Sequence, residues 1–183
     1  MIVELNGLAG VGKLTIGRIL ARSLDARLID NHTIYDPAFA TTIFGSLEFR
    51  ETVRAVRDIA FDRAASLPVG TPIVLTIAPG RDRHWGEEWQ QAIRKLADAR
   101  RVPLVGVHLH CLPDEIARRI SNPDRAMTRK LTDVAVLTDG AQRPILLNHC
   151  DRRFDLDVTL CSAVEAAAMI LRWVSGCAAD FPA

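Results

Sequence analysis

The stretch from Gly7 to Lys13, GLAGVGK, places three glycines and a lysine between two apolar segments. The preceding residues 2–5 form a short apolar run closed by Asn-Gly, which is typical of a buried strand. Apolar residues then recur at helical spacing from Leu14 to Leu24. A glycine-rich turn in this context predicts that the chain begins with a strand that passes directly into a helix.

The rest of the chain repeats this alternation. We expect further strands in four later apolar runs, at Arg27–Asp30, 72–80, 103–111 and 156–160. Helical spacing or a helix-start signal marks four further segments, at 49–64, at 85–96, from Pro113 onward and at 163–174. Asp36-Pro37 is expected to break the chain. Short strands alternating with helices predict the α/β class, with three α/β/α layers around a five-stranded parallel sheet.

Length and composition limit the range of functions. A chain of 183 residues with 49% hydrophobic and 25% charged residues fits a single globular domain over 1–183. The net charge of +1 gives no basic excess to favour a nucleic-acid partner. No signal-peptide pattern or membrane-length apolar run is present, so we expect a cytoplasmic protein without a membrane partner. The four cysteines fit no zinc-site spacing, which favours free thiols packed in the interior: Cys111, Cys150, Cys161 and Cys177.

The glycine-rich stretch has the composition of a phosphate-binding loop. Backbone N–H groups must curl around phosphate oxygens, and side chains would obstruct that approach. The following helix adds the partial positive charge of its N-terminus, and Lys13 adds a full charge. The usual hydroxyl after the lysine is displaced by one residue, because Leu14 precedes Thr15. The candidate nucleotide-binding residues are therefore Gly7, Leu8, Ala9, Gly10, Val11, Gly12, Lys13, Leu14 and Thr15.

The sequence GVGKLT resembles that of the P-loop nucleotide and small-metabolite kinases, which include adenylate, shikimate and gluconate kinases and chloramphenicol phosphotransferase. Adenylate kinases share the late hydroxyl, with Gly where this chain has Leu14. The resemblance implies a P-loop NTPase fold of the nucleotide-kinase type that binds ATP and Mg²⁺. Thr15 is then expected to contact a phosphate oxygen, while ATP oxygens and water supply most Mg²⁺ ligands.

A catalytic carboxylate is not obvious. Many P-loop proteins end the third strand with an Asp, but here that run reads IVLTIAPG. Asp30 is the nearest candidate, as a base toward the acceptor hydroxyl and, with Thr15, as a Mg²⁺ ligand. His32 is a competing base that would also contact the acceptor, and Asp82 is a third candidate. Asp30 could instead be a helix cap, and His32 a packing residue.

Arginines are the candidate contacts for the small-molecule acceptor. Arg50, Arg54 and Arg57 recur at i, i+4 and i+7, which places them on one helix face. They could clamp an anionic acceptor or form a solvated face paired with acidic neighbours on the same helix. Arg81, in APGRDR after the third strand, faintly resembles the Gly-Pro-Arg turn of adenylate kinases and is a further acceptor contact.

The polar stretch 121–133 is the candidate lid. Asn122-Pro123 should end the preceding helix. The resemblance to adenylate and shikimate kinases, in which a lid lays arginines over ATP, carries Arg119 and Arg125 over as ATP-binding residues. Arg125 is also expected to be catalytic, because a guanidinium matches the oxygens of the transferring phosphoryl group. A solvated basic loop is the alternative, and Arg129 competes for the same role.

These features predict a kinase that transfers the γ-phosphoryl group of ATP to a small-molecule acceptor. The catalytic residues would be Lys13, Asp30 and Arg125, and the acceptor would be a metabolite, a nucleoside or an antibiotic hydroxyl. One alternative is a regulatory or assembly ATPase with slow hydrolysis. A second is a kinase that acts on nucleic-acid ends.

Overall fold

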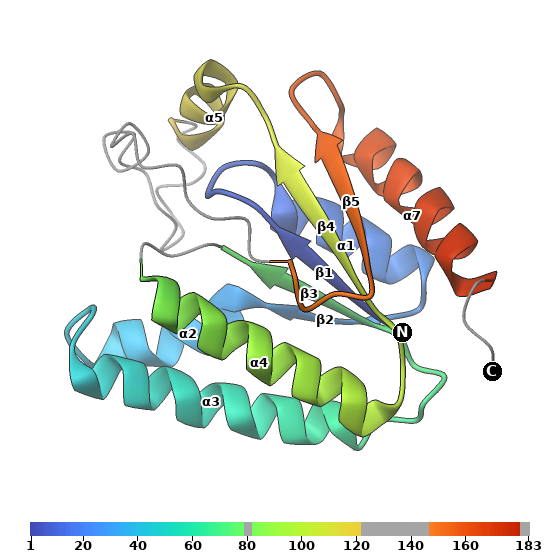
Figure 1. Ribbon diagram of the computed structural model, residues 1–183. Coiled ribbons are helices and arrows are strands. Elements are labelled where there is room, and N and C mark those ends of the chain that lie inside the picture. Colours follow the sequence, from blue (N-terminus) through green and yellow to red (C-terminus); the bar gives the residue numbers. More distant parts are fainter. Residues whose placement is uncertain (79–81, 122–146, 180–183) are drawn as a thin grey trace.

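The computed structural model describes residues 1–78, 82–121 and 147–179 (Figure 1). Its elements follow in the order β1 (Ile2–Asn6), α1 (Lys13–Ser23), β2 (Arg27–Asp30), α2 (Asn31–Thr41), α3 (Leu47–Ala65), β3 (Ile73–Ile77), α4 (Arg83–Arg100), β4 (Leu104–His110), α5 (Pro113–Ile120), β5 (Arg152–Asp157) and α7 (Ala163–Ala179). Alternating strands and helices confirm the predicted α/β class.

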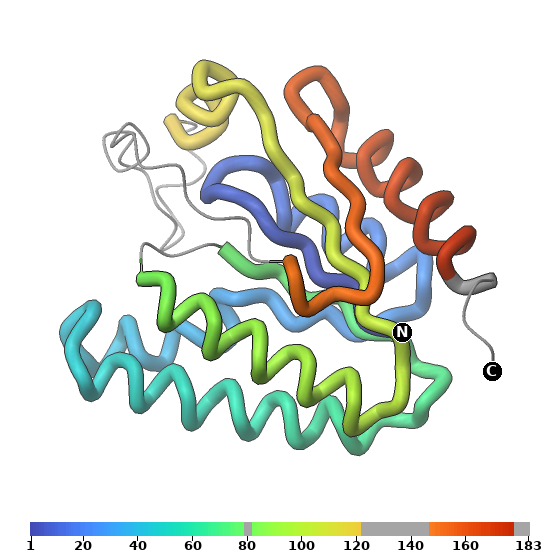
Figure 2. The backbone as a smooth tube through the Cα atoms, in the orientation of Figure 1, coloured from blue at the N-terminus to red at the C-terminus, as the bar shows by residue number. Residues whose placement is uncertain are grey.

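The five strands form one parallel sheet in the order β2-β3-β1-β4-β5. β1 is therefore central, and the backbone trace shows it in blue between green β3 and yellow β4 (Figure 2). Helices α1 and α7 cover one face of the sheet, and α2, α3 and α4 cover the other (Figure 1). This is the predicted three-layer α/β/α arrangement.

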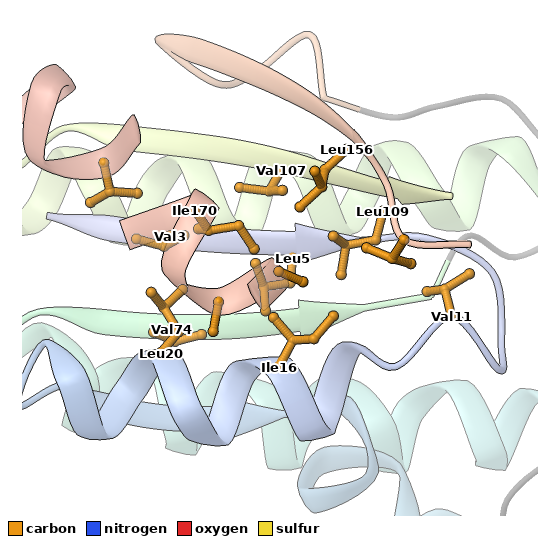
Figure 3. Close-up of a cluster of buried hydrophobic side chains, with 14 of the residues drawn as sticks. Val3, Leu5, Val11, Ile16, Leu20, Val74, Val107, Leu109, Leu156 and Ile170 are labelled. Carbon is orange, nitrogen blue, oxygen red and sulfur yellow. The ribbon is translucent and has the colours of Figure 1, made fainter. Parts of the chain in front are cut away.

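Strand alternation divides the core between the two faces of the sheet. Val3 and Leu5 of β1 pack in one cluster with Ile16 and Leu20 of α1 and Ile170 of α7 (Figure 3). Ile2 of the same strand belongs to the second cluster, with apolar residues of α2, α3 and α4. Burial on both faces is expected for the central strand of a parallel sheet.

The predicted break at Asp36-Pro37 is wrong, because α2 continues through Pro37. A proline inside a helix removes one backbone hydrogen bond, which normally ends the helix. Here Ile34 and Ala38 are buried in the core on either side of the proline. Tyr35 also stacks on Trp89 of α4, with ring centroids 5.7 Å apart. Tertiary packing therefore overrides the local signal.

The last strand begins earlier than its apolar run suggested. β5 spans Arg152–Asp157 rather than 156–160, and Leu160 is 95% exposed. β5 is an edge strand that pairs with β4 from Val105↔Arg152 to His110↔Asp157. An edge strand needs only one apolar face, so its apolar residues define its bounds in the sequence poorly. The register with β4 defines the bounds of β5 instead.

Residues 79–81 and 122–146 lie outside the part of the chain that the structure describes. The candidate lid 121–133 is therefore represented by Ser121 alone, the C-cap of α5. Arg81, Arg125 and Arg129 lie outside the described residues as well. None of the described helices combines the length and apolar character needed to cross a membrane.

Arg100, at the end of α4, ties that helix to the loop between α3 and β3. Its side chain is only 3% exposed, and its guanidinium donates to five backbone carbonyls. The acceptors belong to Ala64, Leu67, Pro68, Val69 and Thr71. One side chain thus bridges the end of α3 and the following turn, and it adds to the backbone hydrogen bonds that the carbonyls of Ala64 and Pro68 already accept from Leu67 and Thr71.

We predict that Arg100→Met lowers the free energy of unfolding by about 2–4 kcal/mol, because the hydrogen bonds from the buried guanidinium to the end of α3 and the following turn are lost. Chemical denaturation measures the change. Arg100→Lys should recover only part of it, since an ammonium cannot reach all five carbonyls. Arg172→Met, at an exposed position on α7, is the matched control. Equal stabilities of Arg100→Met and Arg172→Met would contradict this role.

Candidate active site

The loop between β1 and α1 turns the backbone at the carboxyl end of the central strand. Gly10 and Gly12 adopt φ of 95° and 101°, which L side chains rarely reach. A Cβ on Gly10 would also stand 2.9 Å from Cγ1 of Ile120, so α5 closes over the loop. Gly12 then serves as the N-cap of α1 without any side-chain cap. The first N–H groups of the helix are therefore left for another acceptor.

Lys13 occupies the inside of this turn. Its side chain is buried, at 8% exposure, and its Nζ donates to the carbonyl oxygens of Gly7, at 2.6 Å, and Leu8, at 2.8 Å. The carbonyls of the loop thus hold the ammonium beside the positive end of α1. Lys13 and the helix N-terminus together concentrate positive charge at one point, which suits a phosphate group.

Thr15 lies in the first turn of α1 and is exposed, whereas Leu14 is half-buried. The late hydroxyl therefore belongs to an accessible residue, and the usual hydroxyl position is filled by an apolar side chain. The contact of the Thr15 hydroxyl with a phosphate or with Mg²⁺ remains a prediction.

Arg119 of α5 lies against the same loop. Its Nη1 donates to the carbonyl of Val11 at 3.2 Å, and its Nη2 donates to the carbonyl of Val158 at 2.7 Å. Glu115 accepts from its Nε at 2.6 Å. Arg119, which the resemblance predicts to bind ATP, thus lies beside the loop, and Glu115 fixes its orientation.

Asp30 ends β2 and is buried, at 8% exposure. Its Oδ1 accepts a short hydrogen bond from the hydroxyl of Thr76 in β3. The same hydroxyl oxygen accepts from the backbone N–H of Asn31 at 3.1 Å. Thr76, which is 0% exposed, therefore holds the carboxylate and the start of α2 together.

The register of the sheet relates Asp30 to the loop. Asp30 pairs with Thr76, and Thr76 pairs with Leu5 of β1, two residues before Gly7. Two strand spacings separate Asp30 from Leu5, which is roughly 10 Å between backbones. The buried carboxylate and the glycine loop thus both lie at the carboxyl ends of the parallel strands. Ligands of parallel sheets bind at these ends.

The other candidate bases have local partners. His32 lies in the first turn of α2, with its Nδ1 3.3 Å from Oδ1 of Asp36. Asp82 is the N-cap of α4 and accepts from the backbone N–H of Trp85 at 3.1 Å. That hydrogen bond lowers the pKa of Asp82, and a further contact with Arg50 contributes. Asp82 thus has a clear capping role.

The arginine face of α3 points toward α4. Arg54 and Arg57 both donate to Glu88, at 2.8–3.1 Å for Arg54 and 2.9 Å for Arg57, and Arg50 lies 2.8 Å from Asp82. Arg54 also lies 5.1 Å from the ring centroid of Trp85. These guanidinium groups therefore link α3 to Glu88 of α4 and to Asp82, the N-cap of α4, while Arg57 also pairs with Asp58 of α3 itself, 3.0 Å away. An additional contact of Arg50 or Arg54 with the acceptor remains a prediction.

Two contacts at this site involve residues that the sequence did not single out. Thr76 is the one polar residue in the buried run IVLTI, and Glu115 lies in the first turn of α5. A hydroxyl inside an apolar strand could have indicated a polar partner across the sheet. A glutamate in a first helical turn is ordinarily explained by the helix dipole, which conceals its link to Arg119.

We predict a pH-dependent contribution from Glu115. Hydrogen bonds from Arg118, and then from Arg119, lower its pKa from 4.5 to about 2. A depressed carboxyl pKa stabilises the fold fully above the unfolded value, and the contribution is lost as pH falls through about 2. The melting temperature of wild type should therefore exceed that of Glu115→Gln above about pH 5, and the gap should shrink toward about pH 2.

Glu87→Gln, which removes an exposed i,i+4 pair with Arg83 on α4, is the control for this comparison. A gap between wild type and Glu115→Gln that stays constant over the acidic range would refute the assignment.

Several solved structures that resemble this chain in fold are described as kinases. A candidate kinase from Chloroflexus aurantiacus matches with a TM-score of 0.71 at 15% identity, over 98% of this chain and 96% of that one. A shikimate kinase from Bacteroides thetaiotaomicron matches with a TM-score of 0.59 at 19% identity, over 96% and 98%. The APS kinase of Mycobacterium tuberculosis, solved with AMPPNP and APS, matches with a TM-score of 0.58 at 20% identity, over 95% and 96%.

No protein-family model matches this sequence, and no curated protein matches it either. Nearly full coverage of chains that are 15–20% identical, with TM-scores of 0.58–0.71, establishes a shared fold. The chain therefore has the fold of the P-loop small-molecule kinases.

Proposed function

We propose that this protein is an ATP-dependent kinase that phosphorylates a hydroxyl of a small molecule. One observation carries the proposal. A buried lysine lies inside a glycine loop at the start of α1, and a buried carboxylate lies on the same sheet edge two strands away. The kinase descriptions of the structural neighbours, which include a gluconokinase and shikimate kinases, support it.

The glycine loop, together with Lys13 and Arg119, binds the phosphates of ATP in this proposal. Backbone N–H groups from Gly7 to Thr15, the ammonium of Lys13 and the guanidinium of Arg119 surround the phosphates. Lys13 must exchange the carbonyls of Gly7 and Leu8 for phosphate oxygens. Mg²⁺ neutralises phosphate charge when bound, and the accessible hydroxyl of Thr15 and the carboxylate of Asp30 are its candidate protein ligands.

The acceptor lies between the loop and the start of α2. Asp30 orients the attacking hydroxyl and accepts its proton, and Thr76 holds the carboxylate in place. His32, Arg50, Arg54 and, beyond the described residues, Arg81 are the candidate acceptor contacts. Arg125, in the candidate lid 121–133, stabilises charge on the transferring group. The acceptor class is a metabolite, a nucleoside or an antibiotic.

A second candidate function is slow ATP hydrolysis in a regulatory or assembly protein. The observation that favours it is the end of β3, where Ile77 and Ala78 stand in place of an acid that would hold Mg²⁺. A kinase of nucleic-acid ends is less well supported, because a net charge of +1 offers little attraction to phosphate backbones.

ADP release, measured against a panel of nucleosides, sugars, shikimate-like acids and antibiotics, separates these functions. Strong stimulation by one compound supports the kinase. A slow rate that no compound changes supports the ATPase. Stimulation by an oligonucleotide, steeply weakened by salt, supports the nucleic-acid kinase.

We predict that Lys13→Ala lowers ATP turnover at least about 100-fold, because the loop loses its only full positive charge toward the phosphates. Circular dichroism should remain that of the wild type. Lys95→Ala, at an exposed position on α4, is the matched control and should keep full activity. Normal turnover by Lys13→Ala would remove the loop from the active site.

We predict that Asp30→Asn lowers kcat by roughly 10²–10⁴, the usual effect of losing a general base, with a smaller effect on ATP affinity. Steady-state kinetics with a responsive acceptor measures both. Asp62→Asn, exposed on α3, is the control for the substitution itself. His32→Gln tests the rival base, and a loss confined to His32→Gln would transfer the role to His32. A variant Asp30→Asn that only melts at lower temperature would indicate a purely structural carboxylate.

A further inference from the structure

Glu4 is a glutamate buried in the middle of the central strand. Its neighbours Val3 and Leu5 face the α1 side of the sheet, so strand alternation turns Glu4 toward the opposite side. The side chain is 1% exposed, and its flanking partners in the sheet are Leu75 of β3 and Gly106 of β4. A carboxylate so deep in a protein requires a compensating partner.

That partner comes from the turn before β5. Residues 147–150 form a tight turn in which the N–H of Cys150 donates to the carbonyl of Leu147 at 3.1 Å. Asp151 anchors the turn, because its Oδ2 accepts from the N–H of Leu104 and its Oδ1 from Arg94 of α4. The turn, in orange before β5, lies on the α4 side of the sheet (Figure 1).

Gly106 makes room for this turn. A Cβ on Gly106 would stand 2.7 Å from Sγ of Cys150 and 2.8 Å from Cδ2 of Leu147. The thiol can therefore approach the sheet surface beside Glu4 only because β4 has no side chain at this point. The glycine and the turn thus place two adjacent side chains, His149 and Cys150, over the carboxylate.

The three side chains converge. Nε2 of His149 lies 2.7 Å from Oε2 of Glu4 and 3.9 Å from Sγ of Cys150. The three ligand atoms all lie within 4.8 Å of one another. In a tetrahedral site with bonds of about 2.0–2.3 Å, neighbouring ligand atoms lie about 3.3–3.8 Å apart. The observed separations bracket that range, so small side-chain rotations suffice to admit an ion.

Two buried polar atoms beside these side chains have no hydrogen-bond partner among the described residues, namely Nδ1 of His149 and Oδ1 of Asn6. Asn6 is 1% exposed and donates its Nδ2 to Oε1 of Glu4 at 3.1 Å. A half-turn of this amide would bring its oxygen to the carboxylate instead, and a cation between the two oxygens would make that arrangement favourable.

We propose that Glu4, His149 and Cys150 bind a zinc-class divalent cation. A carboxylate oxygen, an imidazole nitrogen and a thiolate sulfur form a ligand set that Zn²⁺ accepts. Mg²⁺ prefers oxygen ligands alone, so this site differs in chemistry from the magnesium position at the nucleotide. Three protein ligands leave a fourth position for water or for the amide oxygen of Asn6.

The site would join distant parts of the fold. Glu4 belongs to the central strand β1, three residues before Gly7, whereas His149 and Cys150 lead into β5, the edge strand two positions away. A bound ion would therefore fasten the turn before β5 to the strand that carries the glycine loop. Neither the kinase assignment nor the identity of the acceptor enters this inference.

The test uses the full chain, freed of metal by chelation and then titrated with Zn²⁺ and, as a spectroscopic probe, Co²⁺. We expect one equivalent to bind, with a thiolate-to-cobalt charge-transfer band, protection of Cys150 from alkylation and a raised melting temperature. Cys150→Ser should abolish the band and weaken Zn²⁺ binding at least about 100-fold, beyond the usual effect of an outer-shell partner. Cys161→Ser and His108→Gln are the matched controls and should bind normally.

Three results would overturn the proposal: no stoichiometric binding, a charge-transfer band that survives in Cys150→Ser, or a loss caused equally by the control variants. Glu4→Gln could fail to fold, since it alters a buried hydrogen bond; the alkylation rate of Cys150 in wild type, measured with and without Zn²⁺, then still tests the proposal. If Zn²⁺ leaves that rate and the melting temperature unchanged, Glu4 and His149 form only a hydrogen bond.

Discussion

The turn between β1 and α1 is the constraint on which the rest of this structure depends. β1 is hydrogen-bonded on both sides, to β3 and β4, so the position of its last residue is fixed at the centre of the sheet. The chain then has six residues in which to reverse into α1, and glycines with positive φ at Gly10 and Gly12 permit this. The buried ammonium of Lys13 closes the turn from inside.

The groups around that turn are held by backbone carbonyls and hydroxyls rather than by other ionic side chains alone. Arg119 reaches the carbonyls of Val11 and Val158, and Asp30 depends on the hydroxyl of Thr76. Such partners do not titrate near neutral pH, so the positions of the two charged groups change little over the physiological range. Arg119 and Asp30 therefore hold fixed positions without a ligand, whereas Lys13 would have to release the carbonyls of Gly7 and Leu8 to contact a phosphate.

Sequence reasoning predicted those features that depend on local pattern. Apolar runs located the first four strands, though not the bounds of β5, and the glycine spacing located the loop, because both signals lie within a few residues. Sequence reasoning failed where the local structure depends on a contact with a residue far away in the sequence. The continuation of α2 through Pro37 depends on packing against α4, and the pairing of Arg54 with Glu88 joins residues 34 positions apart. The contact of Asp30 with Thr76 likewise depends on strand register, which no local spacing encodes.

The cluster of Glu4, His149 and Cys150 is the clearest case of this limit, because its ligands lie 145 positions apart and match no spacing template. It also connects to the loop through one hydrogen bond, from Asn6 to Glu4, and Asn6 directly precedes Gly7. A cation on Glu4 would draw the amide oxygen of Asn6 inward and reverse the hydrogen bond that its side chain now donates. Cation binding at this cluster would thus be coupled to the start of the glycine turn, through the single side chain of Asn6 on the central strand.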